Sequence, residues 1–128
     1  MNVDEMRAML DRDAELIKNE EFDKLMDVYT DDAIMILPGR IIRGKEALKA
    51  AHIQIAKYFE HNLTIKHGKI ILLETDDTIL VLDQTFVESD KVNEERRATY
   101  VYRKINGEWL CAIDNSYGTA LFDENFII

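Results

Sequence analysis

Apolar positions in the first half of the chain recur at helical spacing and predict three helices. On a helical wheel, one apolar arc runs through residues 3–19 and a shorter one through residues 21–29. Polar residues 30–32 should end the second helix in a turn. The following apolar run, 33–37, is too short for a helix and precedes a Pro-Gly turn signal, so we expect a small β-hairpin there. An alanine-rich stripe over residues 45–60 predicts the third helix.

The second half of the chain changes to strand-like runs separated by polar turns. These runs cover residues 63–74, 78–89, 95–104 and 108–117. The last two are joined by Asn106-Gly107, the strongest two-residue hairpin signal that a sequence can carry. The four runs therefore predict an antiparallel meander.

The Asn106-Gly107 turn also predicts the register of the last two strands. A two-residue loop pairs Ile105 with Glu108, and opposed residues share one face of the sheet. We expect the helices to cover the more aromatic face, because Tyr and Trp bury a large apolar area and keep a polar atom for a partner. That face carries Ala98, Tyr100, Tyr102, Trp109, Cys111, Ile113, Asn115 and Tyr117. The other face is expected to be convex and to form a homodimer interface through Val101, Leu110 and Ala112.

One carboxylate interrupts the apolar arc of the first helix. Asp13 projects near the middle of that arc, among Met6, Met9, Leu16 and Ile17. A carboxylate there is costly unless a partner or a wet cavity receives it. Two interpretations stay open: Asp13 reaches a backbone donor or an arginine at the helix boundary, or it points into a cavity.

Composition and charge narrow the class of protein. We expect 128 residues to form one domain, 1–128, and the lone Cys111 cannot make an intramolecular disulfide. The acidic start has no signal-peptide pattern, which favours a cytoplasmic protein. A net charge of −9 with scattered basic residues argues against nucleic acid as a partner. No run approaches the roughly 18 apolar residues of a membrane span.

Metal and cofactor signals are weak in this sequence. His52, His61 and His67 fall at no spacing typical of zinc sites and have no cysteine partners. There is no glycine-rich phosphate loop. We therefore expect neither a metal nor an organic cofactor.

Two segments carry a family resemblance that covers nearly the whole chain. They are FDKLMDVYTDDAIMILPGRIIRGKEAL, residues 22–48, and RATYVYRKINGEWLCAIDNSYG, residues 97–118. The chain resembles the nuclear transport factor 2-like superfamily, and most closely its SnoaL-like and ketosteroid-isomerase-like branch. The resemblance implies a cone-shaped α+β fold, in which three N-terminal helices pack on a curved, mainly antiparallel sheet of about six strands around a pocket.

The resemblance also implies positions for catalytic groups, and most of them lack the required residue here. The place of the isomerase base is Leu37, and the place of the second oxyanion donor falls near Val101. The place of the oxyanion tyrosine on the first helix falls on Asp13, and many SnoaL-like chains have a histidine where this chain has Asn115. Ketosteroid isomerase chemistry needs a base and a neutral acid that meet at one enolate, so we reject that activity.

Two functions stay open. The first is a homodimeric domain that binds a small apolar or aromatic molecule in a pocket lined by Tyr29, Met35, Leu37, Tyr58, Tyr100, Trp109, Ile113 and Asn115. The second is an isomerase, cyclase or hydrolase in which Asp13 acts as acid or base on a carbonyl-containing substrate. Asp83 and Gln84 are neighbours in a predicted strand and must face opposite sides of the sheet, but the alternation alone does not decide which of them faces the pocket. The apolar tail 126–128 could cover a neighbouring subunit or close the pocket mouth.

Overall fold

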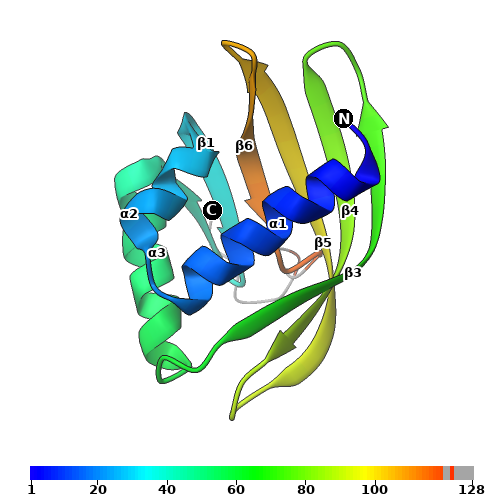
Figure 1. The fold of residues 1–128 in the computed structure, drawn as a ribbon. Helices are drawn as coiled ribbons and strands as arrows, with labels where there is room; N and C mark the ends of the chain where they lie inside the picture. The colour runs from blue at the N-terminus through cyan, green and yellow to red at the C-terminus, as the bar shows by residue number, and fades with distance from the viewer. Residues whose placement is uncertain (120–121, 123–128) are drawn as a thin grey trace.

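Three helical segments lie on one side of a six-stranded sheet in the computed structural model, which describes residues 1–119 and 122 (Figure 1). Helix α1 spans Val3–Lys18, α2 spans Phe22–Leu25 and continues as the 3₁₀ turn η1 (Met26–Val28), and α3 spans Lys45–Tyr58. This is the α+β cone that the sequence predicted. The apolar tail 126–128 lies outside the described residues.

The sheet has the order β2-β1-β6-β5-β4-β3. Its strands are β1 (Tyr29–Leu37), β2 (Arg40–Arg43), β3 (Thr64–Glu74), β4 (Thr78–Glu88), β5 (Asn93–Ile105) and β6 (Glu108–Asn115). All neighbours are antiparallel except β1 and β6, which run parallel. The predicted meander is thus β3 to β6, and the small hairpin β1–β2 joins it beside the last strand.

Local sequence explains where the first helix begins. The Asn2 side chain accepts a hydrogen bond from the Glu5 backbone amide over 2.8 Å, and the Asn2 backbone amide donates one to Glu5 Oε1 over 3.3 Å. This capping box satisfies two backbone donors that the first turn would otherwise leave unpaired. Asp4 and Glu5 also place negative charge at the positive end of the helix dipole.

The predicted end of the second helix was wrong. The helical segment ends at Val28, and Tyr29 already belongs to β1. Residues 30–33 interrupt the pairing of β1 with β6, because Tyr29 pairs with Cys111 while Ile34 pairs with Ile113. The polar residues 30–32 therefore form an irregularity inside a strand, whereas the sequence pattern predicted a turn before it.

The core lies between the helices and the concave face of the sheet. Met6 and Leu10 of α1 and Leu48 of α3 are buried against it. Strand β4 alternates strictly, with every second residue from Ile79 to Val87 buried. The alternation also shows which of the two neighbours points inward: Asp83 faces the helices and Gln84 faces outward.

A bulge in β6 corrects the predicted register. The hairpin pairs Tyr102 with Cys111 as expected, but Val101 pairs with Ile113. Ala112 is therefore an extra residue, and a one-residue bulge reverses the side on which every later side chain lies. Asp114 faces inward opposite Tyr100, while Ile113 and Asn115 face outward opposite Val101 and Thr99. The predicted pocket positions of Ile113 and Asn115 were wrong, as was the outward position of Ala112, which is buried.

Candidate functional site

A cavity of about 110 Å³ lies between α1, α3 and the concave face of the sheet. Its apolar wall includes Leu10 and Ile17 of α1, Phe22 of α2 and the rings of Tyr100 and Tyr102 of β5. A cavity of roughly 150 Å³ with apolar walls holds one benzene ring. The present cavity is somewhat smaller, which limits a ligand to about one ring.

Asp13 reaches this cavity from α1. Its side chain is 14% exposed and makes an ion pair with the more exposed Arg12, Nη2 to Oδ1 at 3.2 Å. Burial raises the pKa of Asp13 to about 6, and the charge and hydrogen bond of Arg12 only partly oppose this. Asp114 raises the pKa further and His67 lowers it, which reflects their presence near the same carboxyl. Asp13 therefore faces the cavity, and its arginine partner is the adjacent Arg12 within the helix, not an arginine at the helix boundary.

Tyr29, His52 and Asp114 form a hydrogen-bonded row in the cavity wall. The Tyr29 hydroxyl donates to Asp114 Oδ2 over 2.7 Å and lies 3.2 Å from His52 Nε2. Its single proton goes to the carboxylate, so Nε2 of His52 must carry a proton and donate to the tyrosine oxygen. Burial lowers the pKa of His52 although Asp114 raises it, which favours a neutral ring. Burial and then Asp114 raise the pKa of Tyr29, which keeps its hydroxyl protonated.

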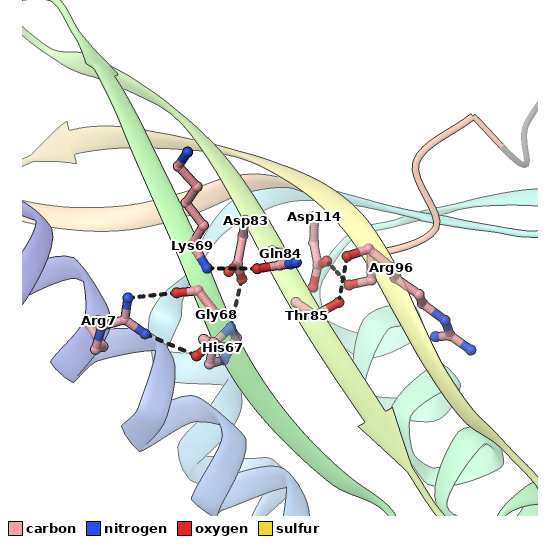
Figure 2. Close-up of polar contacts among 10 residues, drawn as sticks. Arg7, His67, Gly68, Lys69, Asp83, Gln84, Thr85, Arg96 and Asp114 are labelled. Carbon is pink, nitrogen blue, oxygen red and sulfur yellow. Dashed lines mark hydrogen bonds and ion pairs between the residues drawn. The ribbon is translucent and has the colours of Figure 1, made fainter.

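His67 and Asp83 form a second polar pair on the β3–β4 side of the cavity (Figure 2). His67 Nδ1 lies 2.7 Å from Asp83 Oδ2. A bulge in β3 permits this contact: His67 pairs with Thr85, but Ile70 pairs with Asp83, so one extra residue lies between them. Both His67 and Ile70 can then face inward.

The predicted pocket residues divide into two groups. Asp13, Tyr29, Met35, Leu37 and Tyr100 line the cavity. The other four do not line it: Tyr58, Trp109, Ile113 and Asn115. Tyr58 is 63% exposed near the end of α3, and Trp109 packs at the edge of the core with the Lys104 ammonium over its ring.

Sequence reasoning missed Asp114 as a cavity residue and set aside His52 and His67. Asp114 was hidden by the bulge at Ala112, which no glycine marks. His52 lies at the edge of the predicted stripe on the third helix, and that position was its only signal. For His67, the adjacent Gly68 was the available signal, since glycine inside a strand pattern suggests a bulge.

Within the part of the chain that the structure describes, no group of three or more His, Cys, Asp or Glu side chains is arranged to hold a metal ion. None of the helices in that part has the length and apolar character needed to cross a membrane.

Comparisons with known proteins agree on the fold. A Nostoc punctiforme protein of unknown function with a cystatin-like fold is 18% identical, with a TM-score of 0.74 over 89% of this chain and 90% of that one. An NTF2-like protein of unknown function from Pseudomonas putida is 16% identical, with a TM-score of 0.75 over 87% and 82%. A putative dehydratase of the NTF2-like family from Streptomyces avermitilis is 18% identical, with a TM-score of 0.70 over 87% and 93%.

Comparisons of the sequence alone identify a family but no individual curated relative. No curated protein sequence matches the chain. The family model of the SnoaL-like domain matches residues 6–112, which include most of α1, all three cavity histidines and most of the sheet. The chain therefore belongs to the SnoaL-like domain family and has the nuclear transport factor 2-like fold.

Proposed function

We propose that this SnoaL-like domain binds a small apolar or aromatic molecule of about one ring in its cavity. The observation that carries the proposal is the cavity itself, which combines apolar walls with a few inward polar groups. Ligand sites typically have this composition, with the polar groups fixing orientation. Here those groups are Asp13, the Tyr29–Asp114 pair and His67.

The test is a binding measurement with benzene and toluene, using thermal unfolding and calorimetry. A ligand present at about 100 times its Kd stabilises the folded state by about 2.7 kcal/mol, so we expect a clear rise in Tm. The Ala56→Leu variant should lose this rise, because Ala56 is buried and lines the cavity. Ala50→Leu makes the same change at an exposed position of α3 and should behave like the wild type. Absence of binding to the wild type would contradict the proposal.

We also propose that two copies pair through the convex face of the sheet. Across five neighbouring strands, the pairing aligns one outward row of apolar residues: Leu73, Leu80, Val101, Ile113 and Ile34. In a second row, Ile71 lies opposite Leu82, and Ile71 and Leu73 are 44% and 54% exposed. Contiguous apolar surface of this kind is typical of interaction sites. A second copy is the partner that fits, because an apolar row can lie against its own copy without opposing like charges in a chain of net charge −9.

A charge placed in the centre of this row should separate the copies. We expect wild-type protein to sediment as a dimer at micromolar concentration and Val101→Glu to sediment as a monomer, since an unpaired carboxylate in an apolar interface is costly. Gln54→Glu adds the same charge on exposed α3 and should remain dimeric. A wild-type monomer would contradict the proposal, and so would a Val101→Glu dimer.

A second candidate function is acid–base catalysis on a small carbonyl compound. The pKa of about 6 for Asp13 favours it, because a catalytic acid or base works best when its pKa lies near the working pH. In this candidate, the Asp13 carboxylate removes a proton next to the carbonyl, and the resulting carboxylic acid returns the proton to the enolate. Ligand binding needs fewer correctly placed polar groups than acid–base catalysis does. Binding is therefore the function that we put first.

A further inference from the structure

The His67–Asp83 pair is an unusual feature of the cavity wall because both side chains are withdrawn from solvent. The His67 side chain is 4% exposed and that of Asp83 is 0% exposed. Among the described residues, the bond from His67 is the only hydrogen bond to the Asp83 side chain, and Oδ1 has no partner. A buried, ionised carboxylate needs a donor, and we therefore assign the proton of this contact to Nδ1, which donates it to Asp83.

The backbone around His67 holds the ring in this position. Arg7 of α1 donates from Nη1 to the His67 carbonyl over 3.0 Å and from Nη2 to the Gly68 carbonyl over 2.6 Å (Figure 2). The side chains of Gln84 and Phe86 pack closely against Gly68, since a Cβ there would lie 2.5 Å from Gln84 Oε1 and 2.9 Å from Phe86 Cε2. The bulge is thus tied to α1 on one side and packed against β4 on the other.

Fixing the proton on Nδ1 determines what the other ring nitrogen can do. His67 lines the cavity, and no hydrogen bond within the described part of the chain uses Nε2. In a neutral imidazole with a protonated Nδ1, Nε2 is an acceptor. The carboxyl groups of Asp13 and Asp114 also reach this cavity. These three groups are acceptors, and a ligand that bonds to His67 Nε2 must supply a donor.

We propose that His67, oriented by Asp83, selects single-ring ligands that carry an acidic hydroxyl, as phenol does, by accepting their hydrogen bond at Nε2. This inference rests on the proposed function, because it assigns the ligand class of the same cavity. The ring of such a ligand fits the apolar wall, and a hydroxyl is the smallest donor that the limited volume can accommodate. His67 touches the ligand directly, whereas Asp83 is a positioning residue.

The experiment compares phenol, anisole and toluene as probes, measured by calorimetry at about pH 8. Anisole retains the ring and the oxygen but cannot donate a hydrogen bond. We expect the wild type to bind phenol roughly tenfold more tightly than anisole or toluene, which is the usual size of one buried hydrogen bond.

The matched variant is His67→Asn. The Asn amide can still donate to Asp83 from near the Nδ1 position, but it has no counterpart of Nε2. The preference for phenol over toluene should therefore disappear, whatever the variant's affinity for toluene. In ¹⁵N spectra of the wild-type protein, phenol should shift the Nε2 resonance of His67 and leave Nδ1 protonated, a change that a purely structural role would not produce.

The outcomes separate this inference from the proposal on which it rests. If no probe binds the wild type, both fail. If toluene and anisole bind as tightly as phenol, or if His67→Asn keeps the preference, ligand selection by His67 is overturned and the cavity function stands. Should His67→Asn fail to fold, the wild-type preference together with the Nε2 shift still decides, because absence of either one contradicts the proposal.

Discussion

At about pH 8, the Asp13→Asn variant is expected to have a free energy of unfolding about 3 kcal/mol higher than the wild type. Burial raises the pKa of Asp13 from 3.8 to about 6, so the ionised carboxylate is less stable in the folded protein than in the unfolded chain. Each unit of difference corresponds to about 1.4 kcal/mol, which gives roughly 3 kcal/mol once Asp13 is ionised in both states. Asn keeps the size of the side chain and cannot ionise.

The sign of this effect sets its pH dependence. Because the folded pKa is the higher one, the contribution of Asp13 to stability is fully present below pH 3.8 and is lost as the pH rises through about 6. The gap between Asp13→Asn and the wild type should therefore shrink as the pH falls from about 8 to about 4. Urea unfolding at a series of pH values measures it, with Asp11→Asn as a control at an exposed position of the same helix. A gap that does not change with pH would contradict a buried, ionisable Asp13.

The same variant also tests the catalytic candidate. An enzyme that removes a proton next to a carbonyl should speed the exchange of those hydrogens of cyclohexanone for deuterium in D₂O, followed by NMR. If Asp13 is the base, Asp13→Asn should lose at least about 100-fold of this acceleration, the usual contribution of a general base. A wild type that gives no acceleration would remove the catalytic candidate and leave binding unaffected. A gain in stability together with a loss of exchange would identify Asp13 as a group kept for function at the expense of stability.

Asp13 could be predicted from sequence because a helix has a fixed period. A helical wheel needs no knowledge of the partner surface, and a carboxylate on the apolar arc is visible at once. The same holds for the register near the β5–β6 turn, where Asn106-Gly107 correctly implied that Ile105 pairs with Glu108 and Tyr102 lies on the covered face. Local chemistry was sufficient in both cases.

The rest of the site depends on bulges, which strict alternation cannot reveal. One extra residue, Ala112, turns Asp114 into the cavity, and one extra residue in β3 allows both His67 and Ile70 to face inward. In each case the bulge adjusts the strand to sheet curvature, a tertiary property that the local pattern does not encode. The predicted pocket position of Tyr58 was wrong for another reason. The helical period correctly places Tyr58 on the apolar stripe of α3, but at the end of that helix its side chain is mostly exposed.

The hydrogen bond from Tyr29 to Asp114 is the contact in the cavity wall whose loss should cost most. Tyr29→Phe keeps the ring in the core and removes only the hydroxyl, which donates to Asp114 over 2.7 Å. The carboxylate then retains Ser116 Oγ, at 2.9 Å, as its hydroxyl donor within the described residues. Hydrogen bonds to charged groups contribute about 1.5–3 kcal/mol, so we expect a loss of about 2–3 kcal/mol in the free energy of unfolding. The His52 N–H also loses its acceptor, which adds to the cost.

A double-mutant cycle with Asp114→Asn separates this hydrogen bond from other effects of the substitution. In the Asp114→Asn background the acceptor is neutral, so Tyr29→Phe should cost about half as much as in the wild type, because bonds to ionised groups are about twice as strong. Tyr58→Phe removes a hydroxyl from an exposed ring and should stay within about 0.5 kcal/mol of the wild type. If Tyr29→Phe cost no more than Tyr58→Phe, Asp114 would have to be protonated or solvated in the folded protein. The cavity would then be wetter and less acidic than the contacts of Tyr29 imply, and its preference for a hydrogen-bond donor would depend on His67 alone.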